Sequence, residues 1–235
     1  MLSQIFSKDA SKSIKALRYA AYTALGLYGA SLTFEYATEA DFSPEQEQTL
    51  KAVFQDSLDI DAITYRKSKV TDYLIEQNGA EAFALGNDMQ IHTRFYEQKD
   101  PYNMKSWLFL HESTHIWQHQ NCHTPAPHFL YAMAHDLYML HWGNDNGEEH
   151  QNVSYFYRLT ADRDLADYNR EQQASLVADY FRIKNGGYPV YLHFNQNYKR
   201  DMHLYESVMA KFLKDPSYIR ENCTNILYFD AKAGL

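Results

Sequence analysis

A five-residue segment, His111-Glu112-Ser113-Thr114-His115, constrains this 235-residue chain more than any other feature of its sequence. Residues four apart lie on the same face of an α-helix, so His111 and His115 can direct both imidazoles at one point. Imidazole nitrogens bind zinc at about 2.0–2.1 Å. Glu112 follows His111 directly, where its carboxylate can take a proton from a water molecule on the open side of the metal. Two metal ligands and a base within one helical turn predict a zinc-dependent hydrolase of peptide bonds.

The residues around this motif are largely apolar, which predicts a long and mostly buried helix. Residues 107–110 precede the motif, and Ile116 and Trp117 follow it. Phe109, Ile116 and Trp117 are expected to bury the back of the helix, while the polar residues face a cleft. The alternative is a core helix whose histidines only make hydrogen bonds. Burying two imidazoles and a carboxylate without a cation is costly, which disfavours that alternative.

Catalytic zinc usually has three protein ligands and one water molecule, so a third ligand is needed. A third histidine with metzincin spacing would stand at position 121, with glycine at 118, but the chain has Asn121 and Gln118 there. A glutamate from a second helix is the alternative. Residues 159–187 are predicted to form that helix, with Thr160 as its N-cap, and they supply Glu171.

Small residues at i+3, i+4 and i+7 from Glu171 would let this second helix approach the motif helix closely: Ala174, Ser175 and Ala178. The competing interpretations are a surface position for Glu171, or ligation by one of four other residues: His119, His123, Glu148 and Glu149. Outer residues should orient the ligating histidines. Asp167, Asp179 and Gln118 are candidates for that role, each with a solvated position as the alternative. Candidates for an oxyanion donor are Tyr157, His150 and His203.

Two stretches, 109–118 and 168–180, resemble a known family, and residues 53–63 resemble its helix–turn–strand segment. The family is the gluzincin-like metallopeptidases associated with bacterial type VI secretion. They occur as C-terminal extensions of VgrG-type spike proteins and as separate VgrG-related proteins. The resemblance covers about residues 42–185. Gluzincins such as thermolysin carry an aspartate four residues after the glutamate ligand, whereas this chain has Ser175.

The resemblance implies a Zn²⁺ ion bound by His111, His115 and Glu171, with Glu112 as the general base. It also implies an antibacterial toxin that is made in the bacterial cytoplasm, secreted, and active in the periplasm of a target cell. A protein or peptide substrate, a secretion carrier and an immunity protein are the partners that follow from this resemblance.

We expect an α+β, mostly helical, zincin-like fold, with a small antiparallel sheet packed on the motif helix and a second ligand-bearing helix. Residues 1–41 are expected to be an N-terminal helical segment, and residues 42–235 the metallopeptidase domain. Elements are predicted as follows: a helix opened by Ser43 and Pro44, a strand over 61–66, a hairpin of 83–85 and 89–95 around Gly86-Asn87-Asp88, and helices over 129–142 and 202–213. Strand 89–95 is a candidate edge for binding an extended substrate, with an ordinary half-buried strand as the alternative.

The uncharged run 19–34 is too short and too polar for a typical membrane-spanning helix, so we expect a helix docked on the fold. The alternatives are an export signal, a membrane-touching role or a pro-segment role, and contact with a membrane stays open. The two cysteines, Cys122 and Cys223, are expected to be free buried thiols, with a disulfide formed after export as the alternative.

A formal net charge of −8 and an isoelectric point near 5.7 argue against a nucleic-acid partner, which normally meets a basic stripe. Two other functions compete with the peptidase: a hydrolase of peptide or amide bonds in peptidoglycan, and a non-catalytic adaptor stabilised by metal. A structural metal site needs no base, so the presence of Glu112 argues against the adaptor.

Overall fold

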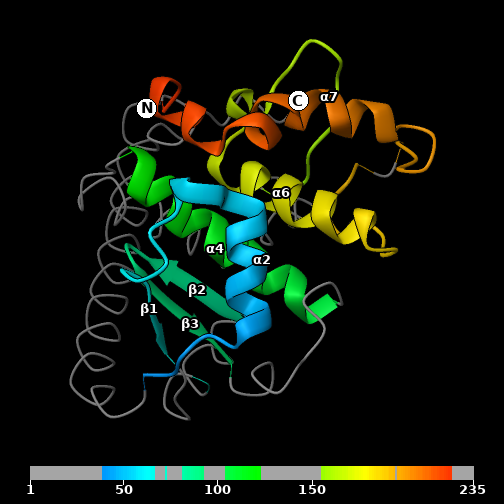
Figure 1. The fold of residues 1–235 in the computed structure, drawn as a ribbon. Helices are drawn as coiled ribbons and strands as arrows, with labels where there is room; N and C mark the ends of the chain where they lie inside the picture. Colours follow the sequence, from blue (N-terminus) through cyan, green and yellow to red (C-terminus); the bar gives the residue numbers. More distant parts are fainter. Residues whose placement is uncertain are drawn as a thin grey trace, which may run out of the picture. The chain divides into compact units, whose positions relative to one another are not determined.

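The computed structural model describes residues 39–66, 72, 81–92, 104–122, 155–193 and 195–223. These residues belong to one compact unit, which comprises 37–124 and 153–235. The unit is α+β, about half helical, with one three-stranded sheet (Figure 1). Residues 1–38 of the N-terminal segment predicted over 1–41, the helix predicted over 129–142, and His150 lie outside the described residues.

The first described helix, α2 (Pro44–Phe54), begins as its sequence predicts. The Ser43 hydroxyl accepts from the Gln46 amide at 3.2 Å, and the Gln46 side chain accepts from the Ser43 amide at 2.8 Å. This reciprocal pair satisfies two donors that a helix start leaves open, and Pro44 occupies a position where no amide hydrogen is needed. The short 3-10 helix η1 (Gln55–Ser57) follows.

The sheet is mixed, so the expectation of an antiparallel sheet is wrong in part. Its order is β1 (Thr64–Arg66), β3 (Asp88–Ile91), β2 (Ala82–Leu85), with β1 parallel to β3 and β2 antiparallel to it. The predicted hairpin is present, with Gly86 at a φ of 62° in its turn. A tight turn forces antiparallel pairing only between the strands that it joins, so the longer connection from β1 leaves that strand free to pair in parallel.

This strand order also changes which strand lies at the edge. The segment predicted as an edge, 89–95, contains β3, which lies between two partners, and its residues 93–95 lie outside the described part of the chain. The edge position next to the motif helix belongs to β2. No strand of the described residues pairs with the second edge of β2.

The motif helix α4 (Met104–Cys122) lies between the sheet and the helix α6 (Arg170–Lys184), and it contacts β2 and β3 as well as α6 (Figure 1). Phe109, Ile116 and Trp117 are buried, as the apolar pattern predicts. The Trp117 ring meets the Phe212 ring edge-on at 5.2 Å between centroids. Phe212 belongs to α7 (Met202–Lys214), whose bounds confirm the predicted helix 202–213.

Helix α6 is shorter than the predicted helix over 159–187. Its N-cap is Asn169, whose side chain accepts from the Gln172 amide at 2.9 Å, and not Thr160. Upstream of Asn169, the Asp164 side chain caps a separate 3-10 helix, η3 (Leu165–Asp167). Each of these side chains satisfies backbone amides of its own short segment, which divides the predicted helix in two.

Cys122 and Cys223 form a disulfide with Cα atoms 5.5 Å apart, so the expectation of free thiols is wrong. Cys122 is the last residue of α4, and Cys223 follows the 3-10 helix η4 (Pro216–Glu221). Arg220 of η4 donates to the Asn121 side chain at 2.8 Å, so the two segments also meet beside the disulfide. Among the described residues, no helix is long and apolar enough to cross a membrane.

Candidate metal centre

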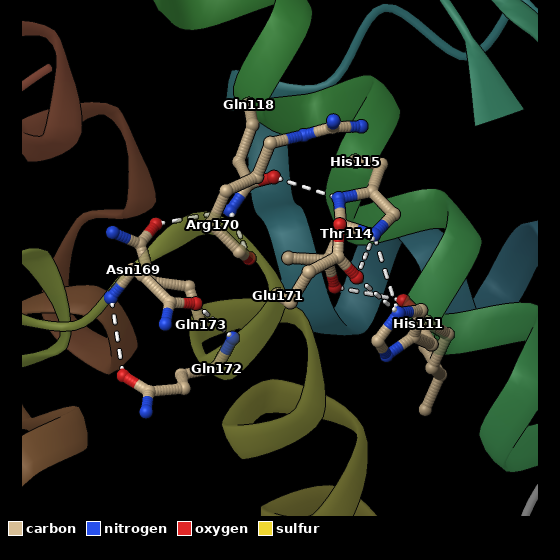
Figure 2. A network of polar contacts seen from close by, with 10 residues as sticks. His111, Thr114, His115, Gln118, Asn169, Arg170, Glu171, Gln172 and Gln173 are labelled. Atoms are coloured by element: carbon tan, nitrogen blue, oxygen red, sulfur yellow. Dashed lines mark hydrogen bonds and ion pairs between the residues drawn. The ribbon is translucent and has the colours of Figure 1, made fainter. Parts of the chain in front are cut away.

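Two imidazoles from α4 and one carboxylate from α6 converge on a single point. The Nε2 atoms of His111 and His115 lie 3.2 Å apart, and Glu171 Oε2 lies 3.2 Å from the first and 3.1 Å from the second (Figure 2). In a tetrahedral zinc site with bonds of about 2.0–2.1 Å, two ligand atoms stand about 3.3–3.4 Å apart. The triangle therefore has the size that three ligands of one metal ion require.

The chemistry of this triangle also fits a cation. All three side chains are buried, and among the described residues they form the one group of histidine, cysteine or acidic side chains that could hold a metal ion. Burial would raise the pKa of Glu171, but the charge and hydrogen bonds of His115 and His111 outweigh it and hold that pKa well below its ordinary value. Glu171 is thus an ionised carboxylate, the form that binds metal.

The other proposed third ligands are not in this triangle. The His119 ring lies at the hairpin turn, where its Nε2 is 3.6 Å from the position that a Cβ atom on Gly86 would take. His123, Glu148 and Glu149 lie outside the described residues.

Close packing of α4 on α6 brings Glu171 to the histidines. Three small residues on the α6 face that carries Glu171 have no exposed surface: Ala174, Ser175 and Ala178. The contacts follow an antiparallel ladder, in which Trp107 meets Asp179, His115 meets Glu171, and Gln118 meets Arg170. The two helices therefore run past each other in opposite directions, with the metal-ligand triangle midway along the ladder.

Glu112 lies on the side of α4 that faces β2. The Ala84 backbone amide donates a hydrogen bond to its carboxylate. The Glu81 carbonyl accepts from the His92 amide, so these two residues form a hydrogen-bonded pair of the β2–β3 ladder. Every second pair along the ladder is of the same kind, namely Phe83 with Gln90 and Leu85 with Asp88. The alternation of an antiparallel ladder then directs the Ala84 amide to the outer edge of β2. Burial is the largest effect on Glu112 and raises its pKa to about 7.

The two histidines are oriented in different ways. His115 Nδ1 lies 2.9 Å from Gln118 Oε1, so Gln118, one of the candidates for orienting a ligating histidine, contacts His115. His111 Nδ1 is buried and has no hydrogen-bond partner among the described residues. Its ring instead packs against two aromatic rings, with the Trp107 centroid at 4.7 Å and the Tyr155 centroid at 5.7 Å. The sequence gives no signal for Tyr155, which stands far from the motif along the chain.

Asp179 and Asp167, the two aspartate candidates for orienting a histidine, both have other partners. Asp167 belongs to the capping box of η3. Asp179 accepts from the Trp107 indole at 2.7 Å, from the Tyr157 hydroxyl at 2.5 Å, and from two backbone amides, of Val190 and Tyr191. Asp179 thus fixes the Trp107 ring that lies on His111, one step further from the metal-ligand triangle.

The same contact removes Tyr157 as an oxyanion donor, because its buried hydroxyl is bonded to Asp179 and to Tyr205. His203 is exposed on α7, outside the metal-ligand triangle. His150 lies outside the described residues.

Burial of Asp179 predicts a pH effect on stability. Burial is the largest effect on this carboxyl and raises its pKa from 3.8 to about 6, against the hydrogen bonds that Tyr157, Val190, Tyr191 and Trp107 donate. The unfolded chain then loses this proton at lower pH than the folded protein does. The stabilising contribution is complete below pH 4 and is lost as pH rises through 6, by about 3 kcal/mol in total.

We expect the free energy of unfolding of the wild type to fall more steeply between pH 4 and pH 6.5 than that of Asp179→Asn. Urea unfolding at a series of pH values measures both slopes. If the wild type instead gained stability relative to Asp179→Asn as pH rises, the four donors would outweigh burial, and this account of Asp179 would be wrong.

No family model matches the chain, and its similarity to known proteins lies with a bacterial spike protein. Over 140 residues, 57% of this chain, the sequence is 31% identical to the type VI secretion system spike protein VgrG2b of Pseudomonas aeruginosa. The chain spans 12% of that protein's length. The effector domain of P. aeruginosa VgrG2b matches in structure with a TM-score of 0.49 and 22% identity, over 85% of this chain and 96% of that domain. The sequence match links this chain to VgrG-related proteins.

Proposed function

We propose that this protein is a zinc-dependent metallopeptidase that serves as a type VI secretion effector. The enzymatic part of the proposal rests on the triangle formed by the ligand atoms of His111, His115 and Glu171. Glu112 follows His111 directly in the sequence, and burial raises the pKa of its carboxyl to about 7. The sequence similarity to VgrG2b supports the secretion part.

Each residue of the site has a defined task in this proposal. His111, His115 and Glu171 would hold zinc in a zincin-like arrangement. When bound, zinc would polarise the scissile carbonyl and make a water molecule acidic enough to lose a proton near neutral pH. Glu112 takes that proton and passes it to the leaving nitrogen, a transfer for which a base with a pKa near the working pH is best suited. The Ala84 amide holds the Glu112 carboxylate in place.

The outer edge of β2 is an argument that the substrate is a peptide. The register that points the Ala84 amide outward also points the backbone groups of Ala82 and the Ala84 carbonyl outward. An extended peptide can add to this edge as a further strand, with its backbone running past Glu112. This role replaces the one expected for strand 89–95.

The disulfide supports action outside the cytosol. Such bonds persist in oxidising compartments, among them the bacterial periplasm, and are rare in proteins that stay in the cytosol. Cys122 lies only seven residues after His115 on the same helix, so the bond secures the helix that carries the site.

Zinc content and zinc-dependent hydrolysis test the proposal directly. We expect the purified wild type to bind one zinc ion per chain and to degrade an unfolded protein such as casein. A chelator should abolish the hydrolysis, and added zinc should restore it. Glu171→Ala should lose most of its zinc by elemental analysis, whereas Glu206→Ala, which removes an exposed glutamate of α7, should keep it.

The choice of substrate separates this function from the alternatives. Release of soluble fragments from purified peptidoglycan sacculi, with no cleavage of casein, would show a peptidoglycan hydrolase that uses the same centre. Full zinc content with no cleavage of either substrate would point to the non-catalytic adaptor. Absence of zinc in the wild type would contradict the metal centre itself.

A further inference from the structure

A chain of two glutamine amides leads from the backbone of α6 to the imidazole of His115. Gln118 Oε1 lies 2.9 Å from His115 Nδ1, and Gln118 Nε2 donates to the Arg170 carbonyl and to Gln173 Oε1, both at 3.0 Å (Figure 2). Gln173 Nε2 donates in turn to the Tyr168 carbonyl at 2.8 Å. Both glutamines are buried, with exposed fractions of 1% and 0%.

The direction of every hydrogen bond in this chain is fixed at its backbone end. A backbone carbonyl only accepts, so the groups that face Arg170 and Tyr168 must be the NH₂ groups of Gln118 and Gln173. The oxygen of Gln118 therefore faces His115 Nδ1. An amide oxygen also only accepts, so Nδ1 must carry the hydrogen, and Nε2 keeps the lone pair that points into the metal-ligand triangle.

We propose that Gln118 is a positioning residue that fixes the tautomer and ring orientation of His115 for metal binding, and that Gln173 holds Gln118 in the amide orientation this requires. The inference rests on the metal centre of the proposed function but not on peptidase activity. His111 has no such support, because its Nδ1 lacks a hydrogen-bond partner among the described residues. His115 is thus the ligand that the fold prepares, and metal affinity depends on the amide chain through it.

The neighbouring Gln172 offers a matched control. It lies on the same helix and has an exposed fraction of 2%. Its Nε2 donates to a backbone carbonyl, of Phe156, at 2.8 Å, and its Oε1 accepts from the Asn169 amide. Gln172 therefore resembles Gln173 in burial and bonding, but its side chain forms its hydrogen bonds with Phe156 and Asn169 and not with Gln118 or His115.

The experiment measures zinc affinity by competition with a chromophoric chelator, for the wild type and for Gln118→Met, Gln173→Met and Gln172→Met. Loss of an outer partner of a histidine ligand typically costs 10–100-fold in metal affinity. We expect that loss for Gln118→Met, a loss of about 3–10-fold for Gln173→Met, and less than a 2-fold change for Gln172→Met. The double variant of Gln118 and Gln173 should bind zinc as Gln118→Met does, because Gln173 acts only through Gln118.

A second measurement separates positioning from general destabilisation. The visible absorption of the cobalt(II)-substituted protein reports ligand geometry, and it should change in Gln118→Met and Gln173→Met but not in Gln172→Met. The Gln173→Met variant keeps Gln118 and its direct contact with His115. It therefore tests the positioning role even if the Gln118→Met variant does not fold.

Two results would overturn the inference: equal zinc affinities of Gln173→Met and Gln172→Met, or an unchanged affinity in Gln118→Met. A wild type that binds zinc tightly yet cleaves nothing would contradict the proposed peptidase and leave this inference standing.

Discussion

Replacing Glu112 with glutamine is expected to reduce hydrolysis by about 10²–10⁴-fold while the zinc content stays at that of the wild type. Glutamine has nearly the same shape as glutamate, but its amide cannot take a proton from water. Glu112 is not one of the three side chains whose atoms converge, so its replacement leaves the metal-ligand triangle intact. Rates of casein hydrolysis and elemental analysis of the same preparations give the two quantities.

Glu47→Gln provides the control for this substitution. Glu47 is a partly exposed residue of α2 that pairs with Lys51 at 3.2 Å and lies outside the metal-ligand triangle, so its loss should change neither the rate nor the zinc content. Unchanged turnover in Glu112→Gln would falsify the assignment of the general base. Loss of zinc together with activity would show instead that Glu112 acts in holding the metal.

Reduction of the disulfide is expected to lower the free energy of unfolding by about 4–5 kcal/mol, the largest effect on stability that we predict. Cys122 and Cys223 are 101 residues apart, and a cross-link over so long a loop removes much of the conformational freedom of the unfolded chain. Urea unfolding with and without a reducing agent measures the difference.

The double variant Cys122→Ala, Cys223→Ala is the control for the reducing agent. It should show the lower stability under both conditions, and the agent should not change it further. Equal stability of the oxidised and reduced wild type would contradict this prediction, because other contacts would then hold the end of α4 against η4. The Arg220 contact with Asn121 is one such contact.

The convergence of His111 and His115 could be predicted because it depends on a short-range pattern. The spacing of four between His111 and His115 brings them to one helical face whatever surrounds the helix. The capping box of α2 and the Gly86 turn were predictable for the same reason, since each depends on a few neighbouring residues. The predicted start of α6 was wrong because the segment before it contains two N-caps. Asp164 caps the separate helix η3, and Asn169, not Thr160, caps α6.

Contacts between distant segments could not be predicted from such patterns. Asp179 was a candidate partner of a ligating histidine, with a solvated position as the alternative, yet its buried carboxylate accepts from Trp107 instead. The sequence does not show which residue Gln118 contacts, because its partners come from a distant helix. Gln173, which accepts from the Gln118 amide, has no signal in the sequence.

The sequence by itself therefore determined the chemical types of the candidate site, namely two imidazoles and a base on one turn of helix and a glutamate on a second helix, because helical periodicity is a local property. Only the tertiary structure decided which strand forms the edge beside Glu112, which cysteines pair, and which side chains orient His115. These outcomes depend on how α4 packs between α6 and the sheet, and that packing is set by shape and burial over the whole fold.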